Sequence, residues 1–105
     1  MATFKSSIGT CGTVAAAAYT APGTGPAIIT SAVFCNITNG DVAQVSVSVT
    51  KGGNTKHVLY QASIPPGGTL TLKPEAQIIL EAGNSLNVQA DQSGAVDYVI
   101  SATEL

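Results

Sequence analysis

Apolar and polar residues alternate along most of this chain. Val45, Val47 and Val49 are separated by Ser46 and Ser48, and similar alternation recurs further along the sequence. A period of two places successive side chains on opposite faces of a β-strand, as expected where one face is buried. The pattern predicts strands over residues 29–37, 45–50, 58–64, 69–73, 78–80, 86–90 and 96–100.

Turn-forming residues separate these segments. The Gly-rich stretch 51–54 predicts a short hairpin connection, and the Pro-Pro-Gly-Gly stretch 65–68 predicts a tight turn, because proline presets a negative φ and glycine accepts a positive one. Residues 83–84 and 92–94 carry similar signals. Short strands at regular spacing predict an all-β protein, either an antiparallel β-sandwich or a jelly-roll-like barrel of about seven to eight strands.

The N-terminal quarter reads differently. Prolines and glycines in residues 20–26 interrupt both helix and strand, so we expect a loop there. The alanines of residues 13–20 favour helix, whereas Gly12, Val14 and Tyr19 around them favour an extended arm or an edge strand. We therefore predict an extended N-terminal arm and loop over residues 1–26 and a β-sandwich domain over residues 27–105, with a helix at 13–20 as the open alternative.

Charge is scarce in this 105-residue chain. Charged residues make up 10% of it and the net charge is −2, against a usual charged share of about 25%. A weakly charged surface costs less to desolvate, which favours self-association or docking onto a larger assembly. Four lysines without arginine argue against nucleic-acid binding. The chain lacks an apolar stretch of membrane-spanning length, and residues 1–7 lack the apolar core of a secretory signal.

The sequence contains cysteine, histidine and aspartate residues of the kinds that enzymes use, but their spacing matches no catalytic motif. A nucleophilic trio would need Cys11 or Cys35, the lone His57 and an aspartate such as Asp41, Asp91 or Asp97, but no motif connects them. One histidine and no closely spaced acidic pair give a metal site no support. We expect a non-enzymatic protein without cofactor or metal. Two buried thiols in a reducing compartment are the favoured interpretation of the cysteines, and a disulfide between them stays open.

Other possible sites have plainer interpretations. The stretch 23–25 is no phosphate loop, because Pro26 removes a backbone donor. The glycosylation signal at Asn36 is incidental without a secretory signal, and Asp91 and Asp97, facing each other across a hairpin, are expected to be solvated. The aromatic residues could form a saccharide surface, but Tyr60 and Tyr98 lie in phase with apolar neighbours, which predicts core positions with the hydroxyl at the rim. The residues weighed for such a surface are Phe4, Tyr19, Phe34, Tyr60 and Tyr98.

The C-terminal half resembles small β-sandwich virion proteins of tailed bacteriophages. The resemblance lies in a proline-glycine turn with its following strand (64–72), an apolar strand leading through Ala-Gly-Asn into the next (78–90), and a last strand that runs into Ser-Ala-Thr-Glu (96–105). It covers about the last 45 residues and the preceding hairpin in outline. It implies assembly roles and no catalytic residues.

Resemblance and composition together lead us to expect a virion structural protein, assembled in the host cytoplasm. Capsid decoration or cement is the first expectation, and a neck, collar, tail or fibre-attachment role is the alternative. A host-glycan or receptor-binding module is the alternative from another class. We expect a trimer or higher oligomer that contacts a major capsid protein or a portal or tail protein. The expected contact residues are Phe4, Ile8, Val14, Tyr19, Pro22, Pro26, Pro65 and Pro66.

Overall fold

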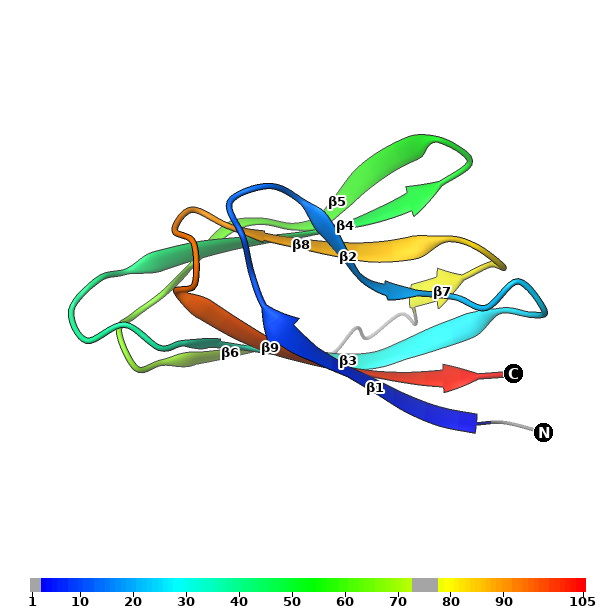
Figure 1. The fold of residues 1–105 in the computed structure, drawn as a ribbon, viewed down its shortest axis with the longest axis horizontal. Coiled ribbons are helices and arrows are strands. Elements are labelled where there is room, and N and C mark those ends of the chain that lie inside the picture. Colours follow the sequence, from blue (N-terminus) through cyan, green and yellow to red (C-terminus); the bar gives the residue numbers. More distant parts are fainter. Residues whose placement is uncertain (1–2, 73–77) are drawn as a thin grey trace.

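Two antiparallel β-sheets stack face to face in this protein (Figure 1). The computed structural model describes residues 3–72 and 78–105. Within these residues the strands are β1 (Thr3–Thr10), β2 (Ala16–Thr20), β3 (Ala27–Asn36), β4 (Ala43–Lys51), β5 (Asn54–Ile64), β6 (Thr69–Leu72), β7 (Ile78–Leu80), β8 (Ser85–Ala90) and β9 (Val96–Glu104).

The strand order is that of a jelly roll. One sheet runs β1-β9-β3-β6 and the other β2-β8-β4-β5. Strands β6 and β7 pair with different stretches of β3, Ala32–Cys35 and Ala27–Ile29, so they share one position at the edge of the first sheet. Each sheet then has four positions. The chain crosses from one sheet to the other at every connection except those from β4 to β5 and from β6 to β7, as in jelly rolls. The prediction of an antiparallel sandwich with jelly-roll character is confirmed.

The core consists of the inward-facing residues of both sheets. Phe34 and Ile100 come from the first sheet, and Val45, Val47 and Leu86 come from the second; all five are fully buried. These positions follow the period-two alternation of the sequence. Burying a side chain of this size contributes about 1.5–3 kcal/mol.

The hairpin between β4 and β5 shows how turn chemistry sets the register. Gly52 and Gly53 both have positive φ values, +58° and +83°, between the paired residues Lys51 and Asn54. A two-residue turn with positive φ at both positions matches the twist of the flanking strands, and glycine adopts it without strain. The hairpin predicted over 51–54 is confirmed.

The N-terminal segment forms strands that lie on the body of the sandwich. β1 pairs with β9 over its whole length and β2 pairs with β8, so both are edge strands. Residues 16–20 are therefore an edge strand and not a helix, whereas β1 was not predicted. Cys11, Ala18 and Ala21 from this segment lie in the core. The division into an arm over 1–26 and a domain over 27–105 stays a prediction.

Candidate functional site

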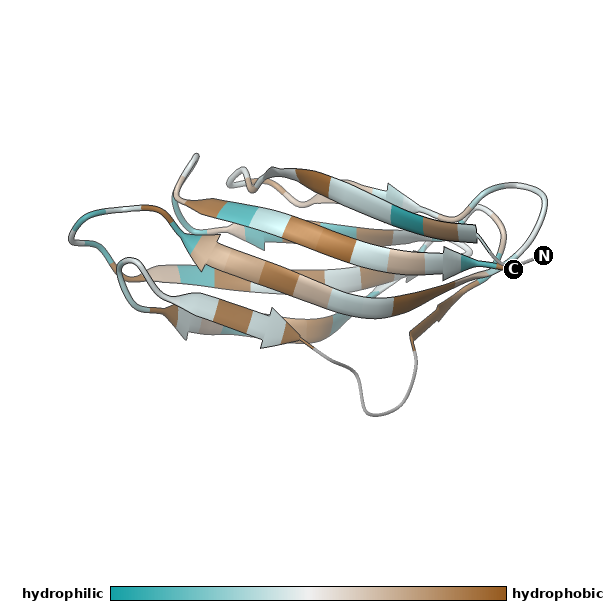
Figure 2. Cartoon of the chain, turned by 90° about the horizontal axis from the view of Figure 1, so that it is seen from below, coloured by the Kyte–Doolittle hydropathy of each residue, from teal (hydrophilic) through white to brown (hydrophobic). Residues whose placement is uncertain are grey.

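The outer surface of the β1-β9-β3-β6 sheet, here called face A, consists of cross-strand rows. One row joins Ile8, Val99, Val33 and Thr71, and another joins Phe4, Thr103, Ile28 and Ile79. A row of Ser6, Ser101 and Ser31 lies between them, and a row of Thr10, Asp97, Cys35 and Thr69 lies beyond Ile8. The view onto this face shows brown apolar bands that alternate with pale ones (Figure 2).

Face A exposes large apolar side chains and almost no charge. Phe4 is 83% exposed, Ile8 74%, Ile79 58% and Val99 45%. Among the described residues of these rows Asp97 is the one carboxylate, and its Oδ1 accepts a hydrogen bond from Thr10 Oγ1 at 2.8 Å. Apolar groups beside hydroxyls are cheap to desolvate, and a depletion of charge marks the centre of protein–protein interfaces.

The sheet edges differ in regularity. β1 pairs with β9 through eight consecutive residues without a bulge, which leaves its other side as a straight edge. In contrast, β5 carries irregularities at two places and β2 at one. Bulges hinder pairing with another chain, whereas a long regular edge is open to it. Of these three edges, β1 is the most accessible to strand addition.

Two of the predicted contact residues, Phe4 and Ile8, lie together on face A. Val14 is exposed on the connection between β1 and β2. Tyr19 is half-buried against the core, and its hydroxyl donates a hydrogen bond to Glu104 Oε2 at 2.5 Å. Burial, reinforced by this hydrogen bond and by the charge of Glu104, raises the pKa of Tyr19 above its usual range. Tyr19 therefore joins the two sheets within the chain.

The predicted prolines do not gather with Phe4 and Ile8. Pro22 and Pro26 lie in the loop between β2 and β3, and Pro65 and Pro66 lie in the turn between β5 and β6. These two connections are at opposite ends of the long axis (Figure 1), which spans 44 Å. Whether any of the eight residues contacts a partner stays a prediction.

The outer surface of the β2-β8-β4-β5 sheet, face B, is polar. Asn87 Nδ2 donates to Thr50 Oγ1 at 2.9 Å and to Ser48 Oγ at 3.3 Å, which links β8 to β4.

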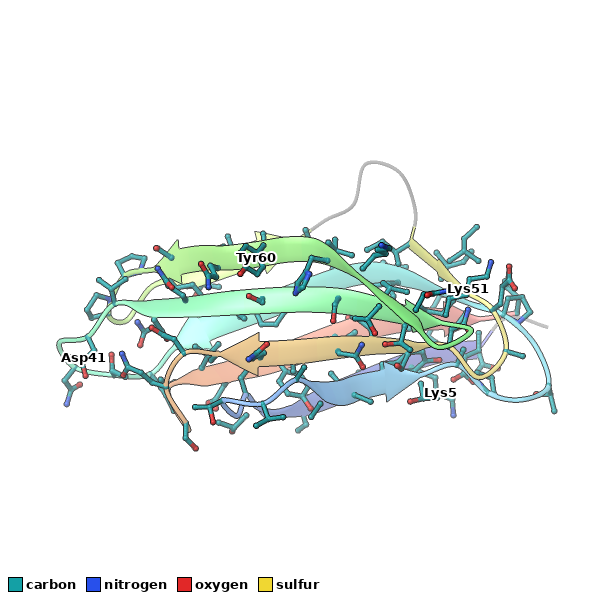
Figure 3. All side chains as sticks on the ribbon, turned by 90° about the horizontal axis from the view of Figure 1, so that it is seen from above. Lys5, Asp41, Lys51 and Tyr60 are labelled. Atoms are coloured by element: carbon teal, nitrogen blue, oxygen red, sulfur yellow. The ribbon has the colours of Figure 1, made fainter. Side chains whose placement is uncertain are left out.

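Tyr60 lies on β5 at the edge of this sheet (Figure 3). It is 66% exposed, so the prediction that it lies in the core is wrong. A bulge at Tyr60 and Gln61, both opposite Ser46, shifts the phase of the strand and turns this ring outward. Tyr98 is partly buried against the core, as predicted.

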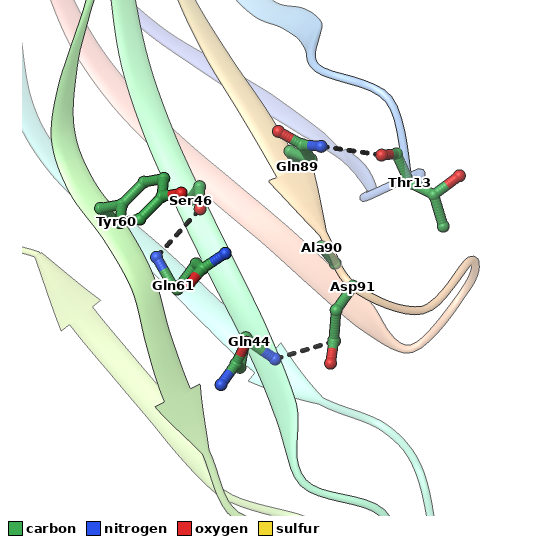
Figure 4. Close-up of a pocket in the computed structure, with 8 residues that line it drawn as sticks. All are labelled: Thr13, Gln44, Ser46, Tyr60, Gln61, Gln89, Ala90 and Asp91. Carbon is green, nitrogen blue, oxygen red and sulfur yellow. Dashed lines mark hydrogen bonds between the residues drawn. The ribbon is translucent and has the colours of Figure 1, made fainter.

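A groove of about 220 Å³ opens on face B beside Tyr60 (Figure 4). Its lining is Thr13, Gln44, Ser46, Tyr60, Gln61, Gln89, Ala90 and Asp91. Two hydrogen bonds hold its rim: Gln89 Nε2 donates to the Thr13 carbonyl at 2.8 Å, and the Gln44 backbone N–H donates to Asp91 Oδ1 at 2.9 Å. The sequence pattern does not predict this groove, because the groove depends on the bulge in β5 and the bulge depends on pairing with β4.

The nucleophilic trio is not assembled. Cys35 lies on face A, His57 contacts Tyr60 on face B, and Cys11 is buried between the sheets. Both cysteines are free thiols, so the disulfide alternative does not hold here. Burial, with a smaller effect of the Asp97 charge, raises the pKa of Cys11 from 9.0 to about 11. Cys11 is buried as expected, whereas Cys35 is half-exposed.

The remaining candidates follow the sheet geometry. Asp91 and Asp97 lie on opposite faces and do not face each other. The Asn36 side chain is buried and donates to the carbonyls of Asp41 and Ile64, at 2.8 and 2.9 Å, so it is unavailable for glycosylation in the folded chain. Residues 3–72 and 78–105 contain no group of three potential metal ligands. The same residues contain no helix of the length and apolarity that crossing a membrane requires.

Comparison with known proteins gives likeness of fold alone. No family model matches the chain, and no curated protein matches its sequence. A chain of the acidic stable capsid structure of Helicobacter pylori bacteriophage KHP30 is similar, with a TM-score of 0.58 and 11% identity over 98% of this chain and 86% of that one.

Two further structures share the architecture. A protein of Bacillus endospore appendages, described as disulfide-linked pili, gives a TM-score of 0.56 and 11% identity over 99% of this chain and 85% of that one. A chain of infectious bursal disease virus, Gt strain, gives a TM-score of 0.50 and 12% identity; the likeness covers 98% of this chain but 32% of the viral one.

Proposed function

We propose that this protein is a non-enzymatic structural component of a virus particle, and that it stabilises a capsid as a decoration or cement protein. The observation that carries the proposal is face A, a sheet surface with exposed apolar rows and one carboxylate among its described residues. The jelly-roll architecture, shared with a chain of a phage capsid structure and a chain of infectious bursal disease virus, supports it. The resemblance of residues 64–105 to tailed-phage virion proteins points the same way.

Repetition explains how such a surface functions. A decoration protein meets identical neighbours around a shell, so modest contacts at each copy are multiplied by avidity. Phe4 and Ile8 place two exposed apolar side chains on β1, beside a regular strand edge, so face packing and edge pairing reinforce each other there. This arrangement supports a trimer or higher ring that binds a major capsid protein, in a virion assembled in the host cytoplasm. A neck, collar, tail or fibre-attachment position uses the same surface.

The likeness to endospore appendages favours a second candidate, a subunit of a filament. The same regular β1 edge and apolar rows support head-to-tail contacts, which form open filaments when the rotation between subunits does not close. The shape of the assembly separates the candidates. Electron microscopy of the concentrated protein is expected to show closed rings or discrete particles for a decoration protein, whereas long filaments contradict the capsid role.

Co-sedimentation with capsids tests the proposal directly. Capsids of the virus that encodes the chain, stripped of minor proteins, are expected to bind it at a fixed stoichiometry and to resist heating better once bound. The variant Ile8→Glu is expected to lose binding, because it places a charge in an apolar row of face A. The variant Val58→Glu changes an exposed valine of the bulged β5 edge and serves as the matched control. Equal binding of both variants, or no binding of the wild type, contradicts the proposal.

A further inference from the structure

The groove on face B has features that the assembly role does not use. Tyr60 exposes 66% of its surface to solvent although it is large and aromatic. The His57 ring contacts it edge to face, with ring centroids 4.9 Å apart and planes at 78°, and so restricts the orientation of the tyrosine ring. An exposed aromatic ring held in a fixed orientation is a stacking platform for a flat apolar ligand surface.

The backbone beside this ring is strained. Gln61 has a φ of +50°, and it is the one non-glycine residue with positive φ in the described part of the chain. Its N–H donates to Ser46 Oγ at 3.0 Å, which ties the bulge to β4. Such a conformation costs on the order of 1 kcal/mol, and residues held in it concentrate at binding sites. The bulge aims Tyr60 and Gln61 toward the groove together (Figure 4).

Uncommitted hydrogen-bonding groups line the rest of the groove. The side-chain amides of Gln44 and Gln61, Gln89 Oε1 and Asp91 Oδ2 make no hydrogen bond to residues 3–72 or 78–105. Amides supply donors and acceptors together, and the carboxylate accepts two hydroxyl donors. The lining contains no lysine, arginine or histidine. One carboxylate without a cation disfavours anionic ligands and suits a neutral ligand rich in hydroxyls.

We propose that this groove binds a neutral saccharide, with one sugar ring stacked on Tyr60 and its hydroxyls bound by Asp91 and the glutamine amides. At about 220 Å³ the groove is smaller than the roughly 300 Å³ of a pocket for a drug-sized ligand, so it holds one or two rings of a longer chain. The site lies on the face opposite the assembly surface. The inference therefore goes beyond the proposed structural role and does not depend on it.

Nitrogen-15 NMR titration of the full chain tests the site. The probes are three uncharged oligosaccharides (maltohexaose, cellohexaose and fully N-acetylated chitohexaose) added to concentrations of about ten times a millimolar Kd. At least one probe is expected to shift the backbone amides of Ser46, Gln61 and Gln89 in a saturable way. Lactose and its sialylated derivative then form a matched pair, in which the anionic sugar is expected to bind more weakly.

Variants separate stacking from hydrogen bonding. Tyr60→Ala is expected to weaken binding about tenfold or more through loss of the stacking surface, and Tyr60→Phe is expected to keep most of it. Phe4→Ala removes an even more exposed aromatic ring from face A and is expected to leave binding unchanged. Gln61→Gly suits the positive φ and removes one amide, so a several-fold loss is expected even if Tyr60→Ala fails to fold.

Three results overturn the proposal: none of the three neutral probes shifts the groove amides, the shifts lie on face A, or Tyr60→Ala binds as the wild type does. Capsid binding and oligomeric state are expected to be the same in Tyr60→Ala and the wild type. A failure of the saccharide site is thus distinguishable from a failure of the structural role.

Discussion

Tyr19 and Glu104 join the two sheets of the sandwich. The Tyr19 hydroxyl on β2 donates to Glu104 Oε2 on β9 at 2.5 Å. On the same side of the molecule, Ser7 Oγ on β1 donates to the carbonyl of Ala18 on β2 at 2.5 Å. These side-chain contacts bind the N-terminal strands to each other and to the C-terminal strand, and among the described residues they leave the backbone edge of β1 unpaired.

Tyr19→Phe removes this link and keeps the packing of the ring. We expect a loss of about 1 kcal/mol in the free energy of unfolding, because the Glu104 carboxylate loses the hydrogen bond that the Tyr19 hydroxyl donates. Urea denaturation followed by far-ultraviolet circular dichroism measures it. Tyr60→Phe is the control and is expected to leave stability unchanged, since its hydroxyl makes no hydrogen bond to the described residues. Equal midpoints for the two variants would show that the link contributes nothing.

Asn36 organises the connection from β3 to β4. Its Nδ2 donates to the carbonyls of Asp41 and Ile64, and its Oδ1 accepts from the backbone N–H and the hydroxyl of Thr38. Asn36→Ala removes all four hydrogen bonds, including the buried one to the Ile64 carbonyl, and we expect a loss of about 2–3 kcal/mol in stability. Asn39→Ala changes an exposed neighbouring asparagine and is expected to cost less than about 0.5 kcal/mol. Similar unfolding midpoints for both variants contradict this role.

Gly9 is required by the close approach of Tyr98. A Cβ at residue 9 would lie 2.5 Å from the Tyr98 hydroxyl oxygen and 2.7 Å from the adjacent ring carbon. We expect Gly9→Ala to displace the ring and to destabilise the protein by about 1–3 kcal/mol, as overpacking does. Gly12→Ala is the matched control, because a Cβ there meets no atom within 4 Å. A thermal midpoint of Gly9→Ala equal to that of Gly12→Ala argues against the steric requirement.

Ionisation of Cys11 is expected to lower the free energy of unfolding at alkaline pH. Its pKa is raised from 9.0 to about 11 in the folded chain, so the folded state holds the proton that the unfolded state releases. The contribution is fully present below pH 9 and is lost as pH rises toward 11, with a size of about 2–3 kcal/mol. Denaturation between pH 8 and pH 10, below the range in which the raised pKa of Tyr19 contributes, is expected to show this decline, and Cys11→Ala is expected to flatten it there. A decline of the same slope in Cys11→Ala assigns the effect to other groups.

Thiol labelling separates the two cysteines without unfolding the chain. At pH 8 we expect a thiol-reactive disulfide reagent to modify half-exposed Cys35 first, with buried Cys11 slower by about a hundredfold or more. Cys35→Ser removes the fast phase and leaves the slow one. A fast phase that survives in Cys35→Ser contradicts the burial of Cys11.

Period-two alternation and turn chemistry were sufficient to predict the strands from β3 to β9, because each buries one face against the same core. β1 escaped prediction because its apolar residues, Phe4 and Ile8, point away from the core and its inward positions include Ser7 and Gly9. Tyr60 was misplaced for a related reason. The bulge that turns it outward depends on pairing with β4, which no local pattern in β5 records.

The same distinction applies to the candidate sites. The sequence predicts Phe4 and Ile8 as contact residues, and the strand register adds Val99 and Ile79 to the same face. The groove on face B combines residues from β4, β5, β8 and the connection between β1 and β2. Residues so distant in sequence converge only through the crossing of strands between the two sheets.

Sedimentation velocity of the wild type beside Ile8→Glu and Val58→Glu tests the central claim that face A is an assembly surface. The account predicts a wild-type trimer or larger ring, a concentration-independent monomer for Ile8→Glu, and wild-type behaviour for Val58→Glu. A wild type that stays monomeric at high concentration, or an Ile8→Glu variant that associates as the wild type does, contradicts it.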